Sequence, residues 1–438
     1  MARRKRGPET GTIASVTHDG RGIVAADGKK VFVAGALSGE TVQFQRRKIR
    51  RNYDEAELLE VVDPSPDRVV ARCAVYGRCG GCALQHIDID AQRAIKAQVL
   101  ADNLARIGNV EPQTWLEPLA GPQWHYRRRA RLAVKDVAGK GRVLVGFRER
   151  HAPFITDMRR CEVIAHPLDA LISPLSDLIG ELSIRARLPQ IEVAVADNAV
   201  ALVFRVLDPP SADDCRRLRA FGDQHALQIW LQPGGLDSLE RIRPRAGAPD
   251  LRYGLPAFGI DIEFGPLDFV QVNGEVNERM VSAAIDHLAP GDDDRVLDLF
   301  CGIGNFSLPL ATRAASVLGI EGVDTLVGRA CHNARLNNID NAEFACADLA
   351  TLDGSERWLR SRWDGVLLDP ARSGAAGVVR HMHLIDPARI VYVSCHPGTL
   401  ARDAATLVHE HGFRLQAAGI IDMFPHTAHV ESVAVFAR

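Results

Sequence analysis

The chain has 438 residues, of which 46% are hydrophobic and 25% charged, and its formal net charge is −2. This length is too great for one compact core, and the hydrophobic fraction excludes a largely disordered chain, so we expect two or three packed domains. No uninterrupted apolar run reaches the roughly 18 residues that a membrane-spanning helix needs, and none follows the basic N-terminus as in a signal peptide, so we expect a cytoplasmic protein.

The basic residues of the first half are concentrated in three runs, although the net charge is small. These runs are MARRKRG at 1–7, QRRKIRR at 45–51 and YRRRAR at 126–131. One such run is equally well explained by a solvated surface or a tail, but three in one half favour a polyanionic partner, RNA or DNA.

Five short β-rich runs separated by turn residues open the chain. They lie at 11–16, 22–25, 30–33, 40–44 and 56–62. Five strands in about sixty residues are typical of a small barrel of the OB type. The Asp-Pro-Ser-Pro-Asp stretch at 63–67 predicts a stiff linker, because paired prolines end a strand, and it marks the first domain boundary.

A cysteine cluster follows the linker. Cys73, Cys79 and Cys82 form a C-x5-C-x2-C pattern with two glycines between the last two cysteines, and Cys161 is a distant fourth. Disulfides are not expected in a reducing compartment. Four thiolates can bind zinc or an iron–sulfur cluster, and the spacing does not choose between them.

The middle of the chain predicts one helix followed by a strand-rich region. Apolar residues recur at helical spacing over 87–107, and Gly108 is suited to end that helix. Strand-like runs follow at 130–134, 143–147, 191–195, 200–206 and 227–231. They predict a second domain that is mostly β or α+β.

Strands and helices alternate from about residue 270 onward. Helices are predicted at 276–288, 305–314 and 322–337, and strands at 295–299, 316–320, 366–368, 390–393, 416–421 and 431–436. This alternation predicts a Rossmann-like, doubly wound and mostly parallel sheet.

A glycine loop follows the first of these strands, in Asp298-Leu-Phe-Cys-Gly-Ile-Gly-Asn305. Ser307 stands where a dinucleotide fingerprint has its third glycine, so S-adenosylmethionine, which has no pyrophosphate, fits better than a dinucleotide. Glu321, at the end of the next strand, is placed to accept hydrogen bonds from ribose hydroxyls, and Asp348, after the following strand, to reach the adenine.

Cys395 stands at the tip of the apolar run Val391-Tyr-Val-Ser-Cys-His-Pro397. A thiolate there can add to an electron-poor ring carbon. An isolated cysteine is usually a small buried apolar residue, but Asp369-Pro-Ala-Arg372 at the end of another strand favours a nucleophile. Four other cysteines have no such context and are interpreted as structural, namely Cys215, Cys301, Cys331 and Cys346.

Five motifs between residues 269 and 432 resemble those of the RNA uracil-C5 methyltransferases, and the resemblance extends over almost the full length. They are FVQVN at 269–273, LDLFCGIGNFSLPLA at 297–311, LLDPARSG at 367–374, VSCHPGTLARD at 393–403 and HVES at 429–432. The family usually has Asn after the catalytic cysteine, where this chain has His396.

The resemblance implies a reaction and assigns roles to residues. Cys395 would add to C6 of uracil, C5 would then take the methyl group of S-adenosylmethionine, and Glu431 would remove the C5 proton. Asp369 would lie at the boundary between cofactor and target base. The implied cofactor contacts also include Gln271, Phe300, Asn305 and Glu321.

The ribosomal branch of this family carries the same cysteine pattern, and the resemblance therefore implies a [4Fe-4S] cluster at the four cysteines, with zinc the alternative occupant. It also implies an N-terminal TRAM barrel. The expected domains are a TRAM barrel at 9–68, a central iron–sulfur domain at 69–264 and the methyltransferase domain at 265–438, with the helix at 87–107 packing on the last.

The expected product is 5-methyluridine, at the 23S rRNA uracil for which that branch is named, made on a base flipped out of its stack. We expect 23S rRNA as partner and no obligate protein partner, hence a monomer. Two alternatives stay open: a uracil-C5 methyltransferase for tRNA or another 23S rRNA site, and a non-catalytic RNA-binding iron–sulfur protein.

Overall fold

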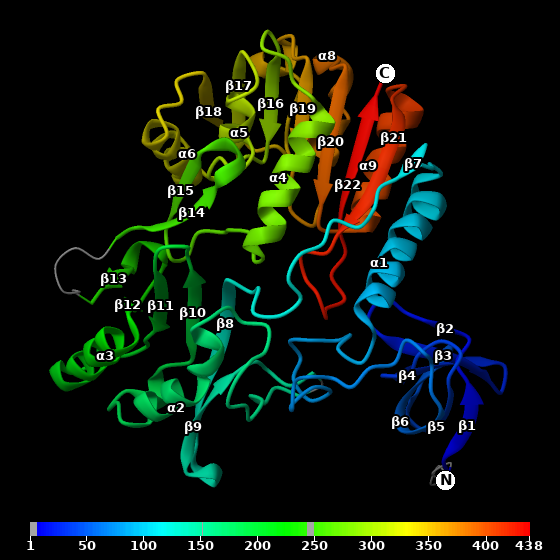
Figure 1. The fold of residues 1–438 in the computed structure, drawn as a ribbon, viewed down its shortest axis with the longest axis vertical. Helices are drawn as coiled ribbons and strands as arrows, with labels where there is room; N and C mark the ends of the chain where they lie inside the picture. Colours follow the sequence, from blue (N-terminus) through cyan, green and yellow to red (C-terminus); the bar gives the residue numbers. More distant parts are fainter. Residues whose placement is uncertain (1–6, 151, 243–248) are drawn as a thin grey trace. The chain divides into compact units, whose positions relative to one another are not determined.

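The computed structural model describes residues 7–150, 152–242 and 249–438 (Figure 1). The described chain forms two compact units, one within 1–99, 147–156 and 424–429, the other within 100–146, 157–423 and 430–438. Of the basic run at 1–7, all but Gly7 lies outside the described residues. In the part of the chain that is described, every helix is too short or too polar to cross a membrane.

A six-stranded sheet forms the first part of the chain. Its strands are β1 (Glu9–Thr12), β2 (Ser15–Val16), β3 (Arg21–Ala26), β4 (Lys29–Ala34), β5 (Thr41–Ile49) and β6 (Tyr53–Asp63). The order is β1-β5-β6-β4-β3-β2, and only two residues of the chain separate the two edge strands β1 and β2. The five predicted strand runs are confirmed, and β5 extends into the basic run.

Alternation of side chains explains how this sheet packs. Val31, Val33, Val42 and Phe44 point inward and are at most 1% exposed. Residues between them on the same strands face outward, as the two-residue period of a strand requires. The sheet therefore has its own apolar core.

The predicted helix at 87–107 is confirmed, with a change of winding near its end. It consists of α1 (Ile89–Asn103) and a π-helical turn, η1 (Leu104–Gly108). Gly108 lies so close to α9 (Pro397–Ala405) that a Cβ there would be 2.7 Å from the carbonyl oxygen of Ala401. Only glycine allows this approach of the two backbones.

A second six-stranded sheet occupies the middle of the chain. Its order is β13-β12-β11-β10-β8-β9, and the strands are β8 (Arg129–Val137), β9 (Arg142–Gly146), β10 (Gln190–Val195), β11 (Val200–Arg205), β12 (Leu227–Gln232) and β13 (Glu240–Arg241). The five predicted runs are confirmed. Two helices, α2 (Ile172–Gly180) and α3 (Ala212–His225), make the region α+β.

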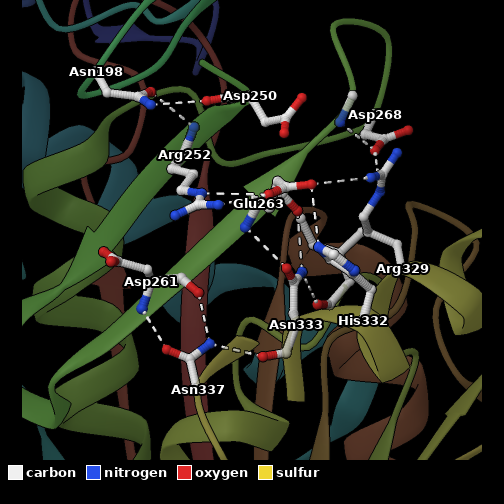
Figure 2. A network of polar contacts seen from close by, with 12 residues as sticks. Asn198, Asp250, Arg252, Asp261, Glu263, Asp268, Arg329, His332, Asn333 and Asn337 are labelled. Atoms are coloured by element: carbon white, nitrogen blue, oxygen red, sulfur yellow. Dashed lines mark hydrogen bonds and ion pairs between the residues drawn. The ribbon is translucent and has the colours of Figure 1, made fainter. Parts of the chain in front are cut away.

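A hairpin of β14 (Leu251–Leu255) and β15 (Ile260–Phe264) follows and is fixed to α6 (Asp324–Leu336) by side-chain amides (Figure 2). Asn333 accepts from the Glu263 N–H at 2.9 Å and donates to its carbonyl at 3.1 Å. Asn337 pairs in the same way with Asp261, at 2.8 and 2.7 Å. The two amides thus satisfy the free edge of β15 as another strand would.

The last part of the chain forms an eight-stranded sheet, ordered β18-β17-β16-β19-β20-β22-β21-β7. Its strands are β7 (Thr114–Trp115), β16 (Arg295–Leu299), β17 (Ser316–Glu321), β18 (Ala342–Cys346), β19 (Gly365–Leu368), β20 (Arg389–Ser394), β21 (Arg414–Ile421) and β22 (Glu431–Ala437). Only the pairs β20·β22 and β21·β22 are antiparallel, which confirms a mostly parallel sheet.

Helices α4 (Gly274–Leu288), α5 (Ser307–Ala311), α7 (Ala376–Val379) and α8 (Met382–Ile385) complete this region, and α4 lies across the sheet (Figure 1). The helix predicted at 305–314 is shorter than expected: α5 begins at Ser307, after the loop that contains Gly304 at φ +97°, and ends at Ala311. The strand order reverses at β16, between β17 and β19, and ligands of such sheets bind beyond the strand ends at that point.

Candidate active site and cysteine loop

The glycine loop leaves β16 at the reversal point of the sheet. The N–H groups of Phe300 and Cys301 both donate to the Ile320 carbonyl, at 2.8 and 3.1 Å. Phe300 has φ +68°, a strained value for a residue with a side chain, and Gly302 has φ +56°. These turns bring the loop across the end of β17, where a ligand can approach the backbone closely.

Glu321 ends β17 and closes one side of this loop. Its carboxylate accepts from the Gly302 N–H at 3.1 Å and from the Gly322 N–H at 2.8 Å. Asp348 follows β18 and is exposed, and its carboxylate accepts from the Ala350 N–H at 2.9 Å. Since the Ala347 N–H donates to the Glu321 carbonyl at 3.0 Å, the two predicted acids lie on neighbouring strand ends.

Asn305 is the centre of a small amide network. It exchanges two hydrogen bonds with Asn277 of α4, each 3.0 Å long. The Tyr253 hydroxyl of β14 donates to Asn305 Oδ1 at 2.9 Å. Gln271 lines a small pocket together with Asn277 and Tyr253. The predicted cofactor residues Gln271 and Asn305 are thus linked through two residues that sequence motifs did not single out.

Asp298 lies buried behind the glycine loop, bonded to the Ser307 hydroxyl. Burial and the charge of Glu321 raise the pKa of Asp298 to about 7. Its Oδ1 has no hydrogen-bond partner within the described chain. An acid in this position can receive a hydrogen bond from a ligand in the loop, and the sequence motifs assigned it no role.

Cys395 directly follows β20 and is partly buried. Burial and the charges of Glu431 and Asp369 raise the pKa of Cys395 to about 11, while Arg372 acts in the opposite direction. The thiol is therefore largely protonated at neutral pH in the absence of substrate. The predicted nucleophile, the predicted base and Asp369 are brought together.

Glu431 is the first residue of β22 and is 7% exposed. Its position beside the thiol follows from the antiparallel register, in which Ser394 of β20 faces Ser432 of β22. Cys395 follows Ser394 and Glu431 precedes Ser432, so the two residues lie at the same end of the two strands. A carboxylate in this position lies next to any substrate group that the thiol attacks.

Asp369 joins the two halves of the site. It follows β19, and its N–H donates to the Leu299 carbonyl at 3.3 Å. Burial, Glu431 and Asp298 raise the pKa of Asp369 well above its ordinary value. Electrostatic coupling to Glu431 on one side and to Asp298 on the other places Asp369 between the nucleophile and the glycine loop.

His396 forms the N-cap of α9, which begins at Pro397. Its Nδ1 accepts from the Thr399 N–H at 3.2 Å. An asparagine side chain can cap a helix in the same way. His396 therefore keeps the capping interaction, although the family usually has asparagine at this position.

Cys73, Cys79 and Cys82 lie on one loop of the first compact unit. The loop turns at Gly77, with φ +83°, and the Cys79 N–H donates to the Val75 carbonyl at 3.0 Å. The Gly81 N–H points to Cys79 Sγ at 3.4 Å, a contact suited to a thiolate ligand. None of the three cysteines is in a disulfide. Such thiols fit a metal or iron–sulfur centre.

Cys161 belongs to the second unit, where it is buried, and its N–H donates to the Asp169 carbonyl at 3.1 Å. Nearby, ligand atoms of His125, His166 and Asp169 lie within 4.8 Å of one another. The two imidazole rings are stacked 4.2 Å apart and nearly parallel, and Arg160 approaches the same carboxylate at 3.7 Å. Parallel rings do not converge on one ion, so we interpret this group as an ion-pair network.

Comparisons with known proteins agree with this geometry. A family model described as tRNA (Uracil-5-)-methyltransferase matches residues 263–438. A Methylococcus capsulatus protein named 23S rRNA (uracil(1939)-C(5))-methyltransferase RlmD is 50% identical over 431 residues, which cover 98% of this chain and 97% of that protein. An Alkalilimnicola ehrlichii protein of the same name is 48% identical, covering 100% and 99%.

Among solved structures, the fold resembles that of the Pyrococcus abyssi tRNA (uracil-54, C5)-methyltransferase in complex with S-adenosyl-L-homocysteine. The TM-score is 0.76, the identity 24%, and the match covers 98% of this chain and 100% of that one. At this identity the likeness shows a shared fold.

Proposed function

Because the chain belongs to the RlmD family of 23S rRNA (uracil(1939)-C(5))-methyltransferases, we propose that Cys395 and Glu431 carry out its reaction. The enzyme transfers a methyl group from S-adenosylmethionine to C5 of uracil in 23S rRNA, giving 5-methyluridine. The observation that carries the proposed mechanism is the common location of Cys395, Glu431 and Asp369 at adjoining strand ends.

The residues around the glycine loop fit S-adenosylmethionine. We propose that Gln271, Phe300, Asn305, Glu321, Asp348 and Asp369 bind it, with Glu321 at the ribose and Asp348 near the adenine. Support comes from the hydrogen bond between the Gly302 N–H and the Glu321 carboxylate. It also comes from Asp298 Oδ1, which is buried and has no hydrogen-bond partner among the described residues. When bound, the cofactor supplies an electrophilic methyl carbon attached to a sulfonium.

Uracil C5 needs activation, since it is a poor nucleophile in the free base. The deprotonated form of Cys395, whose proton has gone to solvent, adds through Sγ to C6 and gives C5 the electron pair of the former double bond. C5 then bonds to the methyl carbon, whose bond to sulfur breaks. Arg372 favours the thiolate that starts the sequence.

Glu431 completes the reaction as general base. Its carboxylate takes the remaining proton from C5, the C5–C6 double bond re-forms, and the bond between C6 and Cys395 Sγ breaks. The nearly complete burial of Glu431 beside the thiol suits this role, because a buried carboxylate is less solvated and accepts a proton more readily. The thiolate is then ready for another uracil.

We propose that residues 9–68 form a TRAM barrel that binds RNA flanking the target, that 69–264 form an iron–sulfur domain and that 265–438 form the methyltransferase domain. The six-stranded sheet of β1 to β6 with its own apolar core and the basic end of β5 support the first part. The target uracil has to leave its stack to reach a partly buried thiol. Because the substrate is 23S rRNA, we propose that the enzyme acts in the cytoplasm.

We further propose that Cys73, Cys79, Cys82 and Cys161 bind a [4Fe-4S] cluster, with zinc as the alternative. The turn at Gly77 and the N–H directed at Cys79 Sγ support a multi-thiolate centre. Methyl transfer moves no net electrons, so the cluster would contribute to folding or RNA contact.

The activity is tested by incubating 23S rRNA that lacks the modification with enzyme and labelled S-adenosylmethionine, then mapping 5-methyluridine. We expect label at uracil 1939. Cys395→Ala should abolish labelling while RNA binding is retained. Full activity of this variant would exclude the covalent mechanism, and label in tRNA or at another 23S rRNA site would contradict the assigned target.

A further inference from the structure

Helix α9 contacts the loop that carries Asp369 and Arg372 at successive points of its backbone. Thr399 Oγ1 lies 3.3 Å from the Arg372 carbonyl. Arg402 donates to the Ser373 carbonyl at 3.0 Å. The N–H of Ala375 donates to Asp403 Oδ2 at 2.7 Å. Three side chains of one helix, spaced over little more than one turn, therefore hold one side of the loop.

The shortest of these contacts, from the Ala375 N–H to Asp403, is buried, and both oxygens of the Asp403 carboxylate accept hydrogen bonds. Asp403 is 1% exposed, and its Oδ2 also accepts from the Tyr392 hydroxyl at 2.7 Å. Arg402 bonds the other carboxylate oxygen at 2.7 Å. Tyr392 is completely buried in β20, three residues before the nucleophile. A buried carboxylate with this many donors has one well-defined position.

Gly374 shows how tightly the loop fits against the helix. It has φ +78°, and a Cβ there would lie 2.5 Å from Arg402 Nη2 and 2.7 Å from Asp403 Oδ2. No side chain fits between the loop and α9 at this point. The Arg402 side chain could move aside, but the buried Asp403 carboxylate and the Thr399 Cβ, which would lie 2.9 Å away, leave no such freedom.

We propose that Asp403 and Tyr392 are positioning residues, which hold the 369–375 loop so that Arg372 stays beside Cys395. The helix that makes these contacts begins two residues after the nucleophile, and the tyrosine lies on the strand that ends at it. The helix and the strand that hold the loop therefore flank Cys395 in the sequence. This inference rests on the proposed role of Cys395.

Release of the loop has a measurable consequence at the thiol. The charged groups that act on Cys395 are Glu431 of β22, and Asp369 and Arg372 of the loop. When α9 no longer holds the loop, Arg372 moves away and the cation that favours the thiolate is lost. Asp369 stays, because it directly follows β19 and its N–H bonds the Leu299 carbonyl, so the burial and the two carboxylate charges that oppose the thiolate remain. The thiol then reacts more slowly at a given pH, because only the thiolate is nucleophilic.

The experiment measures Cys395 alkylation by iodoacetamide, followed on the Cys395 peptide by mass spectrometry, in anaerobically purified full-length enzyme. For Asp403→Asn we expect alkylation near pH 8 to slow by roughly tenfold, the effect of about one pKa unit. We expect kcat for methylation to fall by about 100-fold, as for a small misplacement of catalytic groups, with the KM for S-adenosylmethionine little changed.

Two further variants decide the question if Asp403→Asn does not fold. Tyr392→Phe removes one hydroxyl and leaves the ring packed, and Gly374→Ala pushes the loop off the helix; both should slow alkylation and lower kcat. Asp214→Asn is the matched control, because Asp214 is equally buried but belongs to the cap of α3. It should change stability and leave Cys395 alkylation as in the wild type.

Wild-type alkylation rates in the folded Asp403→Asn or Tyr392→Phe proteins would overturn the proposal, even if stability fell. Because alkylation requires no RNA, the proposed function is judged separately. A wild-type enzyme that does not methylate 23S rRNA, with alkylation still slowed in the variants, would refute the function and leave the positioning role intact.

Discussion

Ser394 of β20 and Ser432 of β22 occupy paired positions, with the Ser432 hydroxyl donating to the Ser394 carbonyl at 3.4 Å. This pairing sets Cys395 and Glu431 at the same end of two adjacent strands. A carboxylate beside a thiol opposes its ionisation, and the raised pKa of Cys395 expresses that cost. The same carboxylate becomes useful after the thiol has bonded to carbon and a proton has to be removed.

Glu431→Gln should separate these two steps. The amide cannot accept the C5 proton, so turnover should fall by about 10²–10⁴-fold, the usual contribution of a general base. Methylated RNA should remain bonded to Cys395 and be detected as a band resistant to denaturant. The double variant with Cys395→Ala should give no such band, and Glu410→Gln, an exposed substitution, should behave as wild type. Absence of the adduct in Glu431→Gln would refute the assigned base.

The pH dependence of Cys395 reactivity follows from its pKa of about 11. The thiolate fraction rises with pH up to that value, so alkylation of the free enzyme should accelerate about tenfold per pH unit between about pH 7 and pH 9. Glu431→Gln removes a negative charge and should lower the pKa, which makes alkylation faster at fixed pH. A plateau already reached at neutral pH would contradict the raised pKa.

Tyr253→Phe should weaken cofactor binding. The variant loses the hydrogen bond to Asn305 Oδ1, which helps to orient that amide. Binding of S-adenosylhomocysteine, measured by calorimetry, should weaken about fivefold, corresponding to about 1 kcal/mol for one hydrogen bond. Tyr53→Phe, in the N-terminal sheet, is the control and should bind with wild-type affinity. Equal affinities for both variants would show that Tyr253 does not position Asn305.

Cys79→Ser should remove the metal centre. Protein purified anaerobically should contain iron and absorb visible light, and the variant should lose both. Cys215→Ser, a cysteine on α3 outside the proposed set, should retain them. Stoichiometric zinc without iron in the wild type would replace the cluster by the zinc alternative.

His396→Asn and His396→Ala should differ in stability. Asparagine can accept from the Thr399 N–H as His396 does, whereas alanine leaves the cap empty and should cost about 1 kcal/mol in the free energy of unfolding. Urea unfolding measures the difference. Equal stability of the two variants would mean that the cap contributes nothing.

Local patterns in the sequence were sufficient to predict the strand ends that carry the reactive groups. The apolar run before Cys395 and the glycines after Asp298 are contiguous, and their spacing reports a buried strand and a tight turn without knowledge of any partner. The strands at 295–299, 316–320 and 390–393 are confirmed for this reason. The motifs that resemble those of the family identified Cys395 and Glu431 in the same way, because each motif is a short contiguous stretch of sequence.

Contacts between distant segments were decided only by the tertiary structure. Tyr253 bonds to Asn305, and Asp403 to the N–H of Ala375, although no single motif contains both residues of either pair. The sheet also gains β7 from Thr114–Trp115, a segment with no strand pattern of its own. A hydrogen bond or strand pairing of this kind depends on which surfaces pack together. The periodicity of one segment records its own buried face, and the identity of the partner that covers that face is fixed only when the whole chain has folded.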